Sequence, residues 1–178
     1  MKPYVSICIP VFKTEELLEE ALQSVLQNDV EHASKNVEVI IVNDGSTSTN
    51  LQGLSCKQIV KKIKKNTKIK INYIEHSQNM GLVEARRSAV YAAKGEYIFF
   101  FDSDDVLTPN CIKDLMSLAQ KENYDIVQGS FVTFPEENKR KIANFHGFLK
   151  DKENFRSWLI EKKSSSFLQL SVLALCCL

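Results

Sequence analysis

Short apolar runs alternate with helical patterns along this chain, and this alternation constrains the fold more than any other feature. The run Val37–Val42 (VEVIIV) is mostly β-branched, and similar runs cover Tyr4–Ile9 and Glu96–Phe101. A strand without regular polar alternation is typical of a sheet that is covered by helices on both faces. The sequence therefore predicts an α/β fold with a mainly parallel central sheet.

The segments between these runs have the spacing of amphipathic helices. We expect Thr14 to cap the first helix and Gly95 to end the third. The expected helices are Glu15–Asn28, Leu51–Lys65, Leu82–Lys94, a helix from Thr108 and Pro109 to about Lys121, and a last one within Lys152–Lys162; further strands are expected at Lys70–Glu75 and within Tyr124–Phe134.

Composition narrows the class of protein. The 178 residues suit about one domain, and 23 basic against 22 acidic residues give a net charge of +1. A dedicated nucleic-acid binder needs a strong basic excess, so we expect no nucleic-acid partner. The five cysteines are scattered without zinc spacing, and no signal-peptide pattern opens the chain. These features favour a cytoplasmic protein with reduced thiols.

Polar residues follow three of the apolar runs, where ligands bind in parallel sheets. Pro10-Val11-Phe12 follows the first run, Asn43-Asp44-Gly45-Ser46 the second, and Asp102-Ser103-Asp104-Asp105 the third. Carboxylates spaced i and i+2 suit Mg²⁺ or Mn²⁺, which in turn could hold a diphosphate. The alternatives are an acidic turn before a helix and an ordinary Asp-Gly turn.

Together these motifs resemble the family 2 glycosyltransferases of the GT-A fold, a Rossmann-like α/β/α sandwich. The resemblance covers residues 4 to about 130, through VSICIPVFKTEELLEEALQSVLQN, VEVIIVNDGSTS, NMGLVEARRSAVYAAKGEYIFFFDSDD and Pro109. It departs from the family at Lys13 and Arg87, where Asn is usual. Residues 1–135 are then the nucleotide-sugar-binding core, and residues 136–178 are an incomplete or atypical acceptor-side segment.

The resemblance also assigns roles to individual residues. It implies that Asp44 contacts the base, that Arg86 lies near the diphosphate, and that Asp104 holds Mn²⁺ or Mg²⁺. The implied nucleotide-sugar-binding residues are Pro10, Val11, Phe12, Glu15, Asp44, Arg86, Asp102 and Ser103. No catalytic base is implied, because the acidic residues after the D-x-D lack the family's context; they are Glu136, Glu137, Asp151, Glu153 and Glu161.

The function implied by the resemblance is inverting sugar transfer. The donor would be a nucleotide diphosphate sugar, most often a UDP-sugar, and the acceptor a hydroxyl of a glycan or a lipid-linked sugar, in surface polysaccharide or glycoconjugate synthesis. Two alternatives are a nucleotide-binding chain without turnover and a phosphatase of the haloacid dehalogenase type. The latter is disfavoured because Asp102 lies mid-chain and lacks that family's following glycine and threonine.

Two further segments carry expectations. Lys57–Lys70 contains seven lysines and no acidic residue, which is typical of a solvated helix face but also suits peripheral contact with the anionic inner face of a membrane. The tail Phe167–Leu178 is strongly apolar. We expect either a buried strand or helix of a missing half, or, with slight preference, a truncated or frame-shifted end that promotes aggregation.

Overall fold

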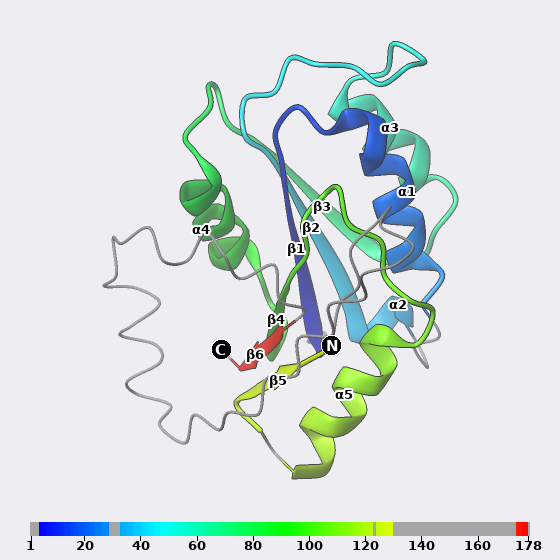
Figure 1. Ribbon diagram of the computed structural model, residues 1–178, viewed down its shortest axis with the longest axis vertical. Coiled ribbons are helices and arrows are strands. Elements are labelled where there is room, and N and C mark those ends of the chain that lie inside the picture. Colours follow the sequence, from blue (N-terminus) through cyan, green and yellow to red (C-terminus); the bar gives the residue numbers. More distant parts are fainter. Residues whose placement is uncertain (1–3, 29–32, 123, 130–173, 178) are drawn as a thin grey trace, which may run out of the picture.

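The protein, as a computed structural model that describes residues 4–28, 33–122, 124–129 and 174–177, is built on one six-stranded sheet (Figure 1). The strand order is β3-β2-β1-β4-β6-β5, and β6 is antiparallel to both of its neighbours. The strands are β1 (Val5–Val11), β2 (Val37–Asn43), β3 (Lys70–Glu75), β4 (Tyr97–Phe100), β5 (Ile126–Gln128) and β6 (Ala174–Cys177). The expected mainly parallel sheet is confirmed.

Helices cover both faces of this sheet, as Figure 1 shows with α4 on one side and α1, α3 and α5 on the other. The larger apolar core joins α1, α3 and α5 to side chains such as Ile7 and Ile9 of β1. A smaller core joins Ala85 and Ala89 of α4 to the opposite sheet face. The helices are α1 (Glu15–Leu26), α2 (Ala33–Asn36), α3 (Cys56–Lys64), α4 (Leu82–Ala92) and α5 (Cys111–Glu122). The result is the predicted α/β/α sandwich.

Strand β1 runs two residues past the predicted end at Ile9 and includes Pro10. The Cys8 carbonyl accepts the Phe101 N–H, so the backbone N–H and C=O groups of the even-numbered residues of β1 face β4. Pro10 faces the same way, but β4 pairs with β1 only as far as Cys8. The missing proline N–H therefore costs no hydrogen bond of the ladder, and β1 reaches the ligand edge of the sheet.

Helix α3 begins at Cys56 and not at Leu51, as the apolar pattern predicted. Leu51 is 90% exposed, and Gly53 has a left-handed φ of 74° that no helix accommodates. Ser55 is the true start, since its N–H donates to Gln58 Oε1 at 2.8 Å in a capping box.

Two predicted helix-end roles were wrong. Thr14 occupies the N-cap position of α1 but makes no capping hydrogen bond with its side chain. Gly95 lies beyond the end of α4, and it is needed because an added Cβ would lie 2.6 Å from the Ser6 backbone nitrogen. Its N–H donates to Ser6 Oγ at 2.8 Å, so the glycine permits close packing against β1 and does not act as a left-handed cap.

The ends of α1 and α5 also differ from expectation, and one residue explains both. Asn28 lies beyond the last residue of α1, where its side-chain amide donates to the carbonyls of Ser24 and Thr108. Its Oδ1 accepts the Ile112 N–H at 2.9 Å, so Asn28 satisfies the first turn of α5 from outside. Helix α5 therefore starts after Pro109, at Cys111.

Part of the apolar tail is a strand. Residues 174–177 form β6, which lies between β4 and β5 with Ile98 opposite Cys176. The rest of the tail, the charged segment 136–141 and the helix expected within Lys152–Lys162 lie outside the described residues. Over the described ranges, none of the helices combines the length and apolar character that crossing a membrane requires.

Candidate functional site

A cavity of about 220 Å³ opens where β1, β2 and β4 end, at the edge predicted from the parallel sheet. Seven of the predicted site residues line it, and Glu15 and Arg86 are absent from the lining. The lining also includes four residues that sequence reasoning did not assign to the site. The full set is Pro10, Val11, Phe12, Thr14, Asp44, Asn79, Leu82, Ala85, Asp102, Ser103 and Asp104.

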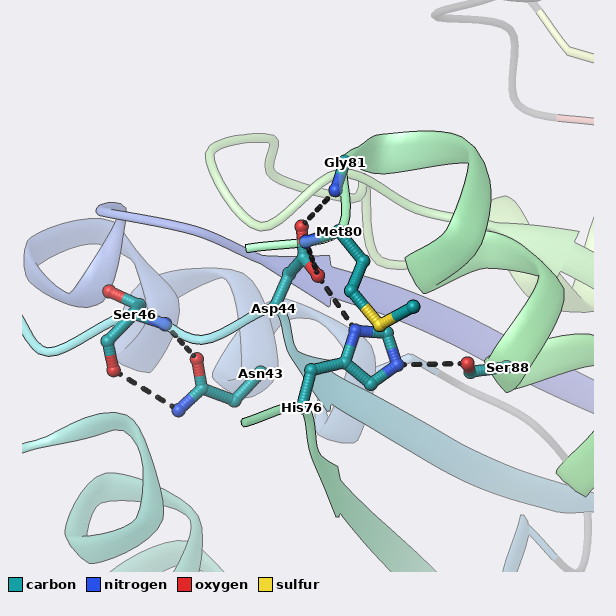
Figure 2. Close-up of polar contacts among 7 residues, drawn as sticks. All are labelled: Asn43, Asp44, Ser46, His76, Met80, Gly81 and Ser88. Atoms are coloured by element: carbon teal, nitrogen blue, oxygen red, sulfur yellow. Dashed lines mark hydrogen bonds and ion pairs between the residues drawn. The ribbon is translucent and has the colours of Figure 1, made fainter. Parts of the chain in front are cut away.

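Asp44 lines this cavity. Three donors hold its carboxylate (Figure 2). Its Oδ1 accepts the Met80 N–H at 2.9 Å and lies 2.7 Å from His76 Nδ1, while its Oδ2 accepts the Gly81 N–H at 2.8 Å. Burial alone would raise the pKa of Asp44, but these hydrogen bonds and the His76 ring outweigh it and lower the pKa. The side chain is therefore a buried carboxylate that stays ionised.

The backbone around Asp44 is equally constrained. Its own N–H donates to the Val11 carbonyl, which ties the end of β2 to the end of β1. Gly45 follows with a φ of 68°, and a Cβ there would lie 2.3 Å from the Gln78 carbonyl carbon. Asp44 and Gly45 together anchor the loop 77–81 over the sheet edge.

Asn43 makes the turn after β2 (Figure 2). Its Oδ1 accepts the Ser46 N–H at 2.8 Å, and its amide nitrogen donates to the Ser46 carbonyl at 3.3 Å. The same amide reaches the Tyr73 hydroxyl at 3.2 Å. The Asp-Gly turn is thus built by Asn43, which leaves the Asp44 side chain directed at the cavity and at the loop 77–81.

The loop after β1 also lines the cavity, through Phe12 and Thr14. Lys13 has a φ of 59°, in the left-handed region, and its N–H donates to Ser46 Oγ at 3.1 Å. Phe12 is 40% exposed at the cavity, and Lys13 Nζ lies 5.2 Å from the centre of its ring. The loop thus presents an aromatic ring to any ligand in the cavity.

The acidic segment after β4 is divided between two environments. Ser103 is buried, and its hydroxyl shares a 2.6 Å hydrogen bond with the Thr14 hydroxyl, which is the contact that replaces the expected helix cap. Asp104 is exposed, and within the described residues no hydrogen bond or ion pair involves its carboxylate. Partial burial, with the charges of Asp102 and Asp104, raises the pKa of Asp105.

Arg86 reaches the site through Asp102. Its Nη2 donates to Asp102 Oδ1 at 2.8 Å, and its guanidinium carbon lies 5.5 Å from the centre of the Phe100 ring. The Nε of Arg86 is buried without a hydrogen-bond partner among the described residues. The structure therefore brings Arg86 to Asp102, the first carboxylate of the D-x-D, and the guanidinium fixes the direction of that side chain.

Glu15 does not line the cavity, although the resemblance implied that it binds the nucleotide sugar. It is 1% exposed at the first turn of α1, and neither carboxylate oxygen has a hydrogen-bond partner within the described part of the chain. Burial, followed by the nearby charge of Glu15, raises the pKa of the Cys56 thiol to about 12. Glu15 therefore faces the α1–α3 packing near Cys56 and lies outside the cavity lining.

His76 is the residue that sequence reasoning missed. It follows the last residue of β3, so it lies at the same sheet edge as Asp44. That position was the available signal, because the carboxyl ends of neighbouring parallel strands meet at one edge. The sequence analysis did not assign His76 to the site, because it is 32 residues from Asp44 along the chain.

No group of three His, Cys, Asp or Glu side chains that could hold a metal ion occurs among the described residues. The Asp104 carboxylate is exposed at the cavity and makes no hydrogen bond or ion pair among the described residues, so it could act as a metal ligand. This fits a hard divalent cation of the kind that takes one or two protein carboxylates and fills its remaining positions with phosphate oxygens and water.

The chain matches a known protein family. The sequence model of the family described as glycosyl transferase family 2 matches residues 6–174. Glycosyltransferase GlyG of Streptococcus pneumoniae is 26% identical over 84% of this chain and 44% of the relative. The GalNAc(5)-diNAcBac-PP-undecaprenol beta-1,3-glucosyltransferase of Campylobacter jejuni is 27% identical over 93% of this chain and 50% of the relative.

A solved structure is also similar. The crystal structure of Staphylococcus aureus TarS 1–349 in complex with UDP has a TM-score of 0.61 and 25% identity, over 76% of this chain and 40% of that one. The chain thus spans half the length, or less, of these relatives.

Proposed function

Because the chain belongs to glycosyl transferase family 2, we propose that its cavity binds a UDP-sugar for transfer, with inversion, to an acceptor hydroxyl. The resemblance read from the sequence motifs is confirmed at the level of the family. The observation that carries the proposal is the pairing, in one cavity, of a buried ionised Asp44 with the Asp102-Ser103-Asp104 segment. The family match leaves the dehalogenase-type phosphatase without support.

The hydrogen-bond capacity of Asp44 favours a base with a ring N–H, such as uracil, over cytosine. A carboxylate oxygen carries two lone pairs. Oδ1 already faces two donors and Oδ2 one, so a single acceptor position remains, on Oδ2. Uracil presents a ring N–H to such a position, whereas cytosine presents a ring nitrogen that accepts. The UDP complex of TarS supports the same choice.

The remaining lining residues fit the other parts of the nucleotide. Pro10, Val11 and Phe12 form the wall that would embrace the nucleoside, with the Phe12 ring available for stacking. Asp102, directed by Arg86, would accept from a ribose hydroxyl. The hydrogen bond between the Ser103 and Thr14 hydroxyls holds the acidic segment beside the cavity.

Asp104 is the residue that would hold Mn²⁺ or Mg²⁺ against the diphosphate. A bound divalent ion neutralises the charge that develops on a departing diphosphate. The residues of the chain itself bind and orient the donor. The proton of the acceptor hydroxyl needs a base, and the five acidic candidates after residue 135 lie outside the described residues.

We further propose that the acceptor is a glycan or a lipid-linked sugar, and that the role is surface polysaccharide or glycoconjugate synthesis. The undecaprenol-linked substrate in the name of the Campylobacter jejuni relative supports this. A cytoplasmic protein peripheral to the inner face of the membrane would meet such an acceptor.

The surface that would contact the membrane is the lysine face of α3, formed by Lys57, Lys61, Lys62 and Lys64. All four side chains are exposed, while Ile59, Val60 and Ile63 on the other side of the helix are buried. Two of the lysines make exposed ion pairs, Lys57 with Glu75 and Lys62 with Glu19, which leaves Lys61 and Lys64 as the stronger lipid contacts. Near an anionic surface each lysine contributes about 1 kcal/mol.

Vesicle sedimentation tests this surface. We expect the double variant Lys61→Glu, Lys64→Glu to lose binding to vesicles that contain anionic lipid. The charge-matched control is the double variant Arg87→Glu, Lys94→Glu, because Arg87 on α4 and Lys94 just beyond it are exposed on the opposite face of the sheet. Equal binding to anionic and neutral vesicles by the unaltered protein would remove the membrane contact from the proposal.

The nucleotide proposal is tested by titration calorimetry of Asp104→Asn. We expect UDP affinity to fall in Mn²⁺, because a charged metal ligand is lost, and to change little in chelator. Equal changes in both conditions would contradict the metal role. Binding of UDP with no release of UDP from UDP-sugars, with or without acceptor, would favour the alternative of nucleotide binding without turnover.

A further inference from the structure

The His76 ring lies between Asp44 and Ser88 of helix α4, as Figure 2 shows, and His76 is absent from the cavity lining. Its backbone N–H donates to the Asn43 carbonyl at 2.9 Å, which fixes the residue at the end of β3. Its ring lies between two polar groups, with Nδ1 2.7 Å from Asp44 Oδ1 and Nε2 2.9 Å from Ser88 Oγ. The side chain is 9% exposed, so these two contacts are made away from bulk water.

The partners determine how the ring is protonated at Nδ1. An ionised carboxylate only accepts hydrogen bonds, so Nδ1 must carry a hydrogen and donate to Asp44. In the neutral ring, Nε2 is then an acceptor, and the Ser88 hydroxyl donates to it. Each polar atom of the ring thus has one partner, and the ring has a single orientation between β2 and α4.

This arrangement controls the direction of the Asp44 carboxylate. The Met80 N–H holds Oδ1, and the Gly81 N–H holds Oδ2 at the start of α4, where Gly81 is the N-cap residue. His76 adds a second link, from Oδ1 to the middle of α4, since Ser88 lies there on that helix. The same helix carries Arg86, which directs Asp102. Helix α4 therefore directs two carboxylates that line the cavity, those of Asp44 and Asp102.

We propose that His76 is a positioning residue for base recognition, which holds the Asp44 carboxylate so that the free acceptor position of Oδ2 faces the nucleobase. The inference rests on the proposed function, because it assumes that the base meets Asp44. His76 acts through Asp44 and touches no part of the nucleotide. Its loss should therefore weaken recognition of the base and spare recognition of the diphosphate.

The test compares two ligands by calorimetry on the full chain in Mn²⁺: UDP, which has a base, and inorganic pyrophosphate, which has none. We expect His76→Ala to lose about tenfold in UDP affinity, which equals about 1.4 kcal/mol, with pyrophosphate affinity unchanged. His76→Asn should recover most of the loss, because its amide nitrogen lies close to the former place of Nδ1. Ser88→Ala should lose less than His76→Ala, because the bond to Asp44 survives.

Three possible results would overturn the positioning role of His76 or the proposed function on which it rests. Unchanged UDP affinity in His76→Ala, while Asp44→Asn weakens UDP, overturns this inference and leaves the proposed function intact. Equal losses for UDP and pyrophosphate in His76→Ala show a merely structural role and also overturn it. Absence of UDP binding by the unaltered protein overturns the proposed function and, with it, the basis of this inference.

A second pair of variants decides the question if His76→Ala does not fold. His76→Asn places a donor near the Nδ1 position, and His76→Gln places one near the Nε2 position. Tighter UDP binding by His76→Asn than by His76→Gln supports the proposal, because only the first restores the donor to Asp44. The reverse order, or equal affinities, contradicts it.

Discussion

Replacement of Asp44 by Asn should change the base preference of the cavity. Asn keeps the shape of the side chain but exchanges one acceptor oxygen for an amide donor. The Oδ1 position faces two donors, from His76 and Met80, whereas Oδ2 faces only Gly81. The amide oxygen therefore stays at the Oδ1 position, and the amide nitrogen takes the side that faces the base.

The magnitude follows from these contacts. A hydrogen bond to a charged group contributes about 1.5–3 kcal/mol, so UDP affinity should fall about 10- to 100-fold. The new donor faces the cavity, so CDP, with an acceptor at its ring nitrogen, should lose much less than UDP. Calorimetry with UDP, CDP and pyrophosphate checks this, with pyrophosphate as the ligand that lacks a base.

The variant also has a cost in stability that must be measured beside binding. The Gly81 N–H loses its acceptor, and because Gly81 is half-exposed we expect a loss of about 1 kcal/mol in the free energy of unfolding. Urea denaturation measures this loss separately. Equal losses of UDP, CDP and pyrophosphate affinity would refute the reasoning and show that Asp44 only anchors the loop 77–81.

Three other predictions concern stability and are measured by urea or acid denaturation. Gly53→Ala should lower the free energy of unfolding by about 1 kcal/mol, because alanine is strained at a φ of 74°. Gly45→Ala should lower it by about 1–3 kcal/mol more, because the new Cβ meets the Gln78 backbone, whereas the space around Gly53 is open. Equal losses in the two variants would contradict the close packing at Gly45. Lys13→Gly should gain about 1 kcal/mol, because its φ of 59° suits glycine, while Lys13→Ala serves as the control without that gain. The Asp44 pKa is lowered in the folded protein, so its contribution to stability is present above about pH 4 and is lost as pH falls through the folded pKa; Asp44→Asn should flatten that part of the acid curve, and an unchanged curve would count against an ionised Asp44.

The sheet and the ligand edge could be predicted from sequence because both depend on local patterns. The VEVIIV run strongly favours a strand that is covered on both faces, and β2 indeed pairs in parallel with β1 and β3. The residues after each strand then had to meet at one edge, which is why Asp44, Asp102 and Asp104 line the same cavity.

What could not be predicted depends on contacts between distant segments. Thr14 bonds to Ser103 and so leaves the helix uncapped by its side chain, which no pattern near residue 14 indicates. The order of β6 within the sheet required knowing that residues 174–177 insert between β4 and β5. His76 gained its partners Asp44 and Ser88 only when three elements met, so its type and position alone did not reveal its role.

The most direct test of the central claim, that this cavity binds a uridine diphosphate with a divalent ion, is thermal unfolding of the unaltered protein with UDP, CDP, ADP and GDP, each in Mn²⁺ and in chelator. Binding to the folded state adds RT ln(1 + [L]/Kd), about 2.7 kcal/mol when the ligand is in hundredfold excess over Kd. We predict the largest stabilisation for UDP in Mn²⁺ and a smaller one in chelator. Stabilisation by none of the four nucleotides, or by all four equally, would contradict the account.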